Sequence, residues 1–255
     1  MKNNLTDKDI EVLNKWAEEY DIEELKIKDK EKIFNLKELY ISEEYIPNEF
    51  FKLTNLEELS IGGKDLMELP KEIGNLTNLK ELFICCKSLR KLPEDIKNLI
   101  NIKRLDILCS YDLELTEEIG NIINLETLYI ACDNLKTIPN EIGKLINLKE
   151  LTIWTEVDGL IELPKEIGNL TNLKRFNIRC QNLKRLPKEI SNLINLEHLY
   201  IGSLNLESIP DEIENLINLE IITIRNPNET WNIKKLPMDG IGKLTKLKEF
   251  CICRR

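Results

Sequence analysis

The sequence predicts an α/β solenoid, with a parallel β-sheet on its concave face and short helical or 3-10 turns on its convex face. The first observation is a phrase close to LPxEIxNLxNLxxLxI that recurs about every 23 residues. The second is the alternation of apolar residues at the end of each phrase, as in a strand, and the third is a proline that opens a helical turn after it. One copy cannot bury its apolar side alone, so the copies are expected to stack.

Ten copies of the phrase can be placed in register, and together they predict one continuous repeat domain over residues 31–255. In the segment 79–84, strand alternation turns Leu82 and Ile84 inward and Phe83 outward. A shortened first copy begins at Leu36, and the others begin at Leu53, Leu76, Leu99, Ile122, Leu145, Leu170, Leu193, Leu216 and Leu244.

The two ends of the chain differ from the repeats. Apolar residues at helical spacing, with Thr6 or Asp7 as N-cap, predict a capping helix within residues 1–30, and a partner-binding helix is the alternative. Segment 250–255 reads as a last strand with no cap after it. We therefore expect a monomer, or a weak dimer that forms through the C-terminal edge.

The recurring phrase resembles that of the leucine-rich repeat family in its typical 23-residue form, over roughly residues 33–253. The resemblance implies a curved solenoid with one parallel strand per repeat, and a function in binding rather than catalysis. The abundance of Ile, Lys, Asn and Glu suggests an AT-rich, bacterial genome. One departure is that the family usually has Asn or Cys where this chain has Lys87, Ser110, Asp133 and Gln181, which leaves the hydrogen bonds of this turn open.

Composition narrows the function classes. The chain has 255 residues, a net charge of -9 and no basic stripe, so nucleic acid is not an expected partner. It has no apolar run of membrane-spanning length and no signal peptide. The expected location is cytoplasmic, or secreted or cell-surface if a signal was trimmed.

Seven cysteines predict buried thiols rather than a metal site or a disulfide framework. Cys86, Cys109, Cys132 and Cys180 share an inward column, and thiols arranged along a line cannot converge on zinc. Side chains stacked on parallel strands are also expected to stand too far apart to bridge. The odd count without a secretory signal fits a reducing compartment. Cys251 and Cys253 face outward on the last strand and are the pair expected to oxidise or to bind metal adventitiously.

Catalytic motifs are missing from the sequence. It has one histidine and no nucleophile elbow, phosphate loop or HExxH motif. The recurring glutamates after the prolines are explained by their place at the start of a helical turn. The prediction is a non-enzymatic protein without cofactor or metal.

Outward strand positions supply the candidate binding residues, because exposed aromatic and arginine side chains are the usual anchors of protein interfaces. Two insertions, after Trp154 and after Arg225, enlarge the adjoining loops, although Trp154 and Trp231 could instead pack locally to close them. The candidates are Tyr40, Phe83, Tyr129, Trp154, Arg175, Arg179, His198, Tyr200, Arg225 and Trp231.

The predicted function is a protein–protein interaction scaffold that binds its partner through the concave sheet and the adjoining loop edge. A partner with an acidic patch is expected to dock near Arg175, Arg179 and His198. The alternative is the targeting domain of a secreted bacterial effector or surface protein.

Overall fold

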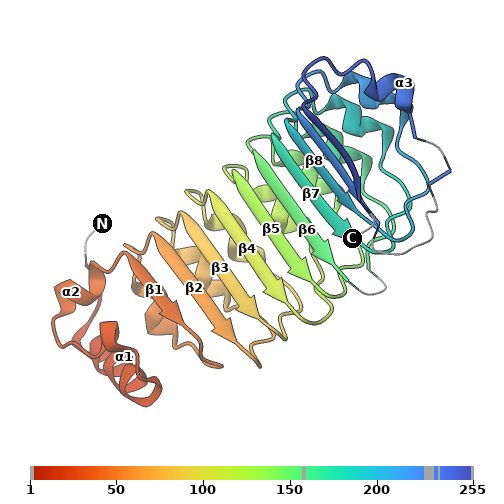
Figure 1. Cartoon of the computed structure of the whole chain (residues 1–255). Coiled ribbons are helices and arrows are strands. Elements are labelled where there is room, and N and C mark those ends of the chain that lie inside the picture. The colour runs from red at the N-terminus through yellow and green to blue at the C-terminus, as the bar shows by residue number, and fades with distance from the viewer. Residues whose placement is uncertain (1–2, 157–158, 227–232, 235, 254–255) are drawn as a thin grey trace.

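A computed structural model of the chain confirms the parallel solenoid and describes residues 3–156, 159–226, 233–234 and 236–253. One sheet of ten parallel strands, ordered as in the sequence, runs the length of the molecule and is only gently curved (Figure 1). The strands are β1 Glu38–Ile41, β2 Glu58–Gly63, β3 Glu81–Cys86, β4 Arg104–Cys109, β5 Thr127–Cys132, β6 Glu150–Thr155, β7 Arg175–Cys180, β8 His198–Gly202, β9 Ile221–Arg225 and β10 Glu249–Cys253.

Neighbouring strands pair without any shift in register, so equivalent residues of successive repeats stand side by side. Leu105 pairs with Leu128 and Leu128 with Leu151, and all three are fully buried. The inward leucines and isoleucines of the sheet belong to one hydrophobic core. The predicted inward columns are therefore confirmed.

Short 3-10 helices carry the chain back behind the sheet (Figure 1). A proline directly precedes each of them from η2 onward except η5, where Thr116 takes its place. Successive helices approach closely, because a Cβ added to Gly168 would lie 2.3 Å from the carbonyl oxygen of Glu189. The helices are η2 Asn48–Lys52, η3 Lys71–Asn75, η4 Glu94–Asn98, η5 Glu117–Asn121, η6 Asn140–Lys144, η7 Lys165–Asn169, η8 Lys188–Asn192 and η9 Asp211–Asn215.

The N-terminal helix α1, Asp7–Tyr20, closes one end of the core. Thr6 and Asp9 form a capping box at its start, and Trp16 packs edge-on against Phe50 with ring centroids 5.9 Å apart. The Trp16 indole N–H also donates to the Tyr45 carbonyl at 3.0 Å. The 3-10 helix η1, Glu23–Leu25, and helix α2, Lys30–Phe34, lead into β1. The predicted capping helix is confirmed, while the domain boundary at residue 30 stays a prediction.

The core is less well covered at the C-terminal end. Helix α3, Met238–Ile241, packs beside η9, and β10 forms the sheet edge. Ile252 of β10 is 38% exposed, whereas its register partner Ile224 is 1% exposed. The last repeat thus leaves part of its inward face open, and pairing between two chains through this edge stays a prediction.

Two sets of hydrogen bonds tie successive repeats together. Before each of the strands β3 to β9, an asparagine donates to a backbone carbonyl of the preceding repeat, as Asn124 does to Ile100 at 2.7 Å. After the strands, the Thr155 hydroxyl donates to the Asp133 carbonyl at 3.1 Å and accepts from the Leu135 amide at 3.3 Å. The Ser203 hydroxyl lies within donor distance of two carbonyls of the preceding repeat, that of Gln181 at 3.2 Å and that of Leu183 at 2.7 Å. In these two repeats, the inward column itself therefore supplies hydrogen bonds of the turn that the sequence left open.

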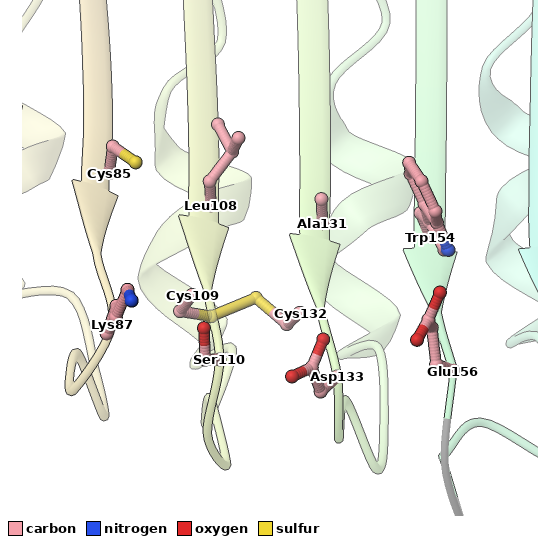
Figure 2. A pocket seen from close by; sticks show the side chains of 10 residues that line it. All are labelled: Cys85, Lys87, Leu108, Cys109, Ser110, Ala131, Cys132, Asp133, Trp154 and Glu156. Atoms are coloured by element: carbon pink, nitrogen blue, oxygen red, sulfur yellow. A yellow bond between two sulfur atoms is a disulfide. The ribbon is translucent and has the colours of Figure 1, made fainter.

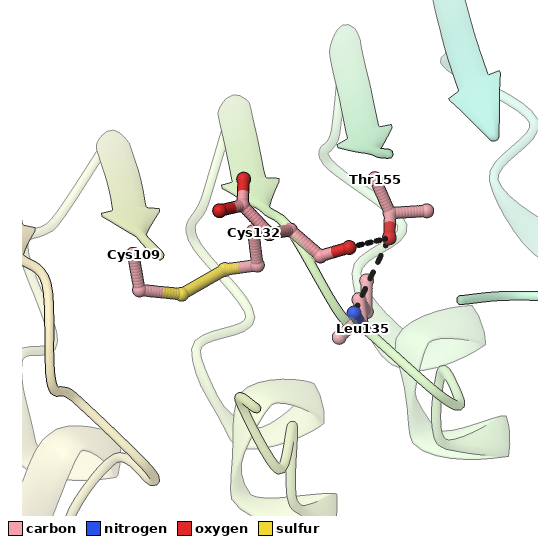
Figure 3. Close-up of a disulfide and its surroundings, with 5 residues drawn as sticks. Cys109, Cys132, Leu135 and Thr155 are labelled. Carbon is pink, nitrogen blue, oxygen red and sulfur yellow. Dashed lines mark hydrogen bonds between the residues drawn. A yellow bond between two sulfur atoms is a disulfide. The ribbon is translucent and has the colours of Figure 1, made fainter. Parts of the chain in front are cut away.

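The prediction that stacked cysteines would not bridge is wrong for one pair. Cys109 and Cys132 form a disulfide between β4 and β5, beside the hydrogen bonds of Thr155 (Figure 3). Their Cα atoms are 4.7 Å apart, which lies within the range that a disulfide spans. The two side chains can lean toward each other and need not stand parallel, so the strand spacing does not prevent a bridge. Cys251 and Cys253, the pair expected to oxidise, are also joined. Cys86 and Cys180 are free buried thiols as predicted, and burial raises the pKa of each to about 12.

Candidate interaction surface on the sheet

Two columns of outward side chains cross the exposed face of the sheet. The tyrosine column consists of Tyr40, Ser60, Phe83, Asp106, Tyr129, Thr152, Asn177, Tyr200, Thr223 and Cys251. The tryptophan column lies two residues further along each strand and consists of Gly62, Cys85, Leu108, Ala131, Trp154, Arg179, Gly202, Arg225 and Cys253. No other described element of the chain covers these columns (Figure 1).

The aromatic residues of the tyrosine column are distributed along the sheet. Tyr40 is 68% exposed at the β1 end, and Phe83 lies beneath the Arg104 guanidinium, 5.4 Å from the ring centroid. Tyr129 and Tyr200 are half-buried and three strands apart. Asp106 is buried despite its outward position, because Arg104 binds its carboxylate at 2.8 Å. The column thus offers separate aromatic positions rather than one aromatic cluster.

Trp154 and Arg179 form a cation–π contact within the tryptophan column. The Arg179 guanidinium lies over the Trp154 ring at 4.7 Å from its centroid. The indole N–H is buried and has no hydrogen-bond partner among the described residues, so the ring is held by packing and by the arginine. Trp154 also borders a hollow of about 320 Å³ that Cys85, Leu108 and Ala131 line (Figure 2).

The predicted basic cluster is not a single site. Arg175 and His198 are register partners at the beginning of β7 and β8, whereas Arg179 is near the end of β7. Arg179 follows Arg175 by four residue steps, which is about 13 Å along a strand. Arg175 is also paired with Glu150 at 2.6 Å. Within the described chain, Arg179 and Arg225 form no ion pair.

Lysines and glutamates just before the strands form ion pairs between neighbouring repeats. Lys103 pairs with Glu126 at 3.0 Å and Lys174 with Glu197 at 3.0 Å. Glu57 accepts hydrogen bonds from Lys37 and Lys80, which lower its pKa to about 2. Because their charges are paired, Lys103 and Lys174 contribute little net field to the sheet face.

Sequence reasoning missed a row of exposed isoleucines in the turns before β4, β5 and β6. Ile100, Ile123 and Ile146 are 59%, 56% and 55% exposed, and they stand in successive repeats. The phrases NLINI, NIINL and KLINL that contain these residues fit the repeated core pattern, although the third-position isoleucine falls between two inward apolar residues. Exposed apolar rows of this kind are a second type of contact surface. The predicted binding residue Trp231 lies outside the described residues.

Neither a metal site nor a membrane-spanning helix emerges from the described residues. No group of three or more His, Cys, Asp or Glu side chains there could hold a metal ion. No described helix is both long enough and apolar enough to cross a bilayer.

The family is shown by a model described as leucine-rich repeat region, which matches residues 10–155 and 136–254. The chain therefore belongs to the leucine-rich repeat proteins, a class of solenoids that commonly bind other proteins. A search of curated proteins found no match.

Among solved structures, the leucine-rich repeat domain of the type III effector XopL is similar at 28% identity, covering 76% of this chain and 70% of that chain, with a TM-score of 0.66. Listeria monocytogenes InlP is 21% identical over 97% of this chain and 71% of its own, with a TM-score of 0.69. The ectodomain of the Arabidopsis thaliana receptor kinase GASSHO1/SCHENGEN3, in complex with CASPARIAN STRIP INTEGRITY FACTOR 2, is 22% identical over 85% and 30%, with a TM-score of 0.59. The last two likenesses concern the fold alone.

Proposed function

We propose that this protein is a non-enzymatic scaffold that binds a protein partner through the exposed face of its sheet and the loop edge beside it. The observation that carries the proposal is the contact of Trp154 with Arg179 at the centre of an uncovered sheet. Tryptophan and arginine anchor protein interfaces more often than other residue types. Leu108, which lies two strands from Trp154 and is 37% exposed, extends the same surface.

The partner is expected to reach the tyrosine column as well. Tyr129 lies on β5 and Tyr200 on β8, so both border the strands that carry Trp154 and Arg179. Each step between strands is about 4.8 Å, which places the four residues within the area of a standard interface. Tyr40 and Phe83 would contact only a partner long enough to reach β1 to β3.

A pull-down from extracts of the source organism and of its host would identify partners of the wild-type protein. The test variant is Y129A/W154A/R179A/Y200A, which should fold but lose the partner, since each true anchor contributes about 2 kcal/mol or more to binding. The matched control is I100S/I123S/I146S, which removes the exposed isoleucines from the edge where the strands begin.

The two variants separate the two surfaces. Partner loss with the sheet variant and retention with the isoleucine variant supports the proposal. The reverse result would move the binding site to the isoleucine row, and retention by both variants would remove it from both surfaces. Thermal unfolding followed by circular dichroism verifies that each variant is folded.

The likeness to the leucine-rich repeat domain of XopL favours a second candidate function, in which this solenoid is the targeting domain of a secreted effector or surface protein. The measurement is a secretion assay of the tagged protein, expressed in cells of the source organism. Retention of the full-length product in the cytoplasm would contradict this second candidate and leave the first one standing.

A further inference from the structure

We propose that the tryptophan column binds an extended peptide segment of the partner that crosses strands β3 to β9, with apolar side chains at β3 to β6 and an aspartate or glutamate side chain at β7 to β9. The inference rests on the proposed function and adds the chemistry and orientation of the ligand.

The first half of the column is continuous and apolar. Cys85, Leu108, Ala131 and Trp154 are consecutive register partners on β3, β4, β5 and β6. They line the hollow shown in Figure 2, and none of the four carries a charge. Three steps of about 4.8 Å correspond to about four residues of extended chain. This half is thus suited to a short run of apolar side chains.

The second half of the column carries two arginines around a glycine. Arg179, Gly202 and Arg225 are consecutive register partners on β7, β8 and β9. Because Gly202 has no side chain, a notch remains there, flanked by the Arg179 Cγ atom and the Tyr200 ring, each 3.2 Å from the position of an added Cβ. None of the described residues that line this notch is acidic. The strands that carry Arg179 and Arg225 lie about 10 Å apart, and both arginines border the notch with no acidic side chain in its described lining.

Arg179 can bind a carboxylate while it remains on Trp154. A guanidinium stacks through its flat face, and its N–H donors lie in the plane of the group. The contact with Trp154 at 4.7 Å therefore orients the group and leaves in-plane donors available. The ring thereby links the apolar half of the column to the charged half.

The charges at the other end of the column offset one another, and this sets the direction of binding. Glu43 and Glu44 border the surface beside Gly62 and Cys85, and Lys64 and Lys87 line the same surface. A ligand carboxylate placed there would meet no net positive field, whereas Arg179 and Arg225 attract it. The segment is thus expected to keep its acidic residue at the β7 to β9 end. Six strand steps of about 4.8 Å correspond to about nine extended residues.

The experiment uses a display library of random segments of about nine residues. Each segment is joined to its carrier through its C-terminus, so that carboxylates come only from aspartate and glutamate side chains. Selections are run on the wild type, on R179E/R225E and on K97E/K188E, which has the same change of net charge on η4 and η8. Each selected segment is then measured for binding to W154A, and circular dichroism verifies the fold of every variant.

We expect W154A to weaken the wild-type segments about thirtyfold, as for a central aromatic anchor. These segments should combine an apolar run with an acidic residue, and K97E/K188E should select the same pattern while R179E/R225E does not. In synthetic peptides of the strongest segment, replacing the acid by its amide should cost about tenfold on the wild type and have little effect on R179A/R225A.

The outcomes separate this inference from the proposed function. Two results would overturn the inference and leave the sheet as the binding surface. In the first, the selected segments need Trp154 but contain no acidic residue. In the second, replacing the acid by its amide weakens binding to R179A/R225A as much as binding to the wild type. If every selected segment binds W154A with the affinity it has for the wild type, so that none depends on Trp154, both the inference and the proposed function are overturned.

Discussion

Replacing Leu128 with alanine should destabilise the protein by about 2 to 5 kcal/mol, because it opens a cavity in the middle of the array. Leu128 is fully buried on β5 between Leu105 and Leu151. Loss of three buried carbon groups costs about 2.4 kcal/mol in transfer free energy at about 0.8 kcal/mol each. The cavity adds to this, since β5 is hydrogen-bonded to a strand on each side and cannot collapse far inward.

The assay is urea unfolding, followed by circular dichroism and by tryptophan fluorescence so that cooperativity is verified. The control is T152A on the next strand, which loses a half-exposed hydroxyl that accepts from Asn177 at 3.3 Å and should cost well under about 1 kcal/mol. Similar midpoints for the two variants would refute the reasoning, because they would show that the inward and outward columns are exchanged.

Four further predictions follow from the packing. Gly168→Ala should lower the thermal midpoint, because its Cβ would lie 2.3 Å from the Glu189 carbonyl oxygen, and an unchanged midpoint would contradict the contact. The pKa of Glu57 is depressed to about 2, so its contribution is present above the ordinary value of 4.5 and is lost as the pH falls toward 2. E57Q should therefore reduce the pH dependence of the free energy of unfolding over that interval. An unchanged pH dependence would argue against the ion pairs. Amide hydrogen exchange should be faster in β10 than in β5, unless two chains pair through the β10 edge. Equal protection of the two strands in a strictly monomeric sample would contradict both the open edge and the pairing. Thiol titration of the unfolded, unreduced protein should find three cysteines, and seven would exclude both disulfides.

The fold was predictable because its information is local and repeated. A strand residue such as Leu128 is inward in one copy for the same reason as its equivalent in every other copy. The period also predicted that Cys251 and Cys253 lie on the outward face. Their register with the outward residues Thr223 and Arg225 confirms this prediction. Errors in one copy are corrected by its neighbours, which makes a repeat array easier to interpret than a fold built from unique contacts.

The candidate site was predicted only in part, since it depends on which residues of different repeats meet. Sequence grouped Arg175 with Arg179 as one positive field, yet these residues occupy opposite ends of β7 and Arg175 is paired with Glu150. Ion pairs between repeats depend on side-chain reach, which the period does not encode. The pair Cys109 and Cys132 was likewise rejected from idealised strand spacing, although the Cα separation of 4.7 Å allows a bridge.

The sequence by itself determined the leucine-rich repeat solenoid, the inward and outward columns and the N-terminal helix, because apolar periodicity and the prolines act within each repeat. Only the tertiary structure decided which charges remain unpaired, which cysteines join and how Trp154 meets Arg179. These features depend on distances between side chains of neighbouring repeats, and such distances exist only once the strands have stacked in register.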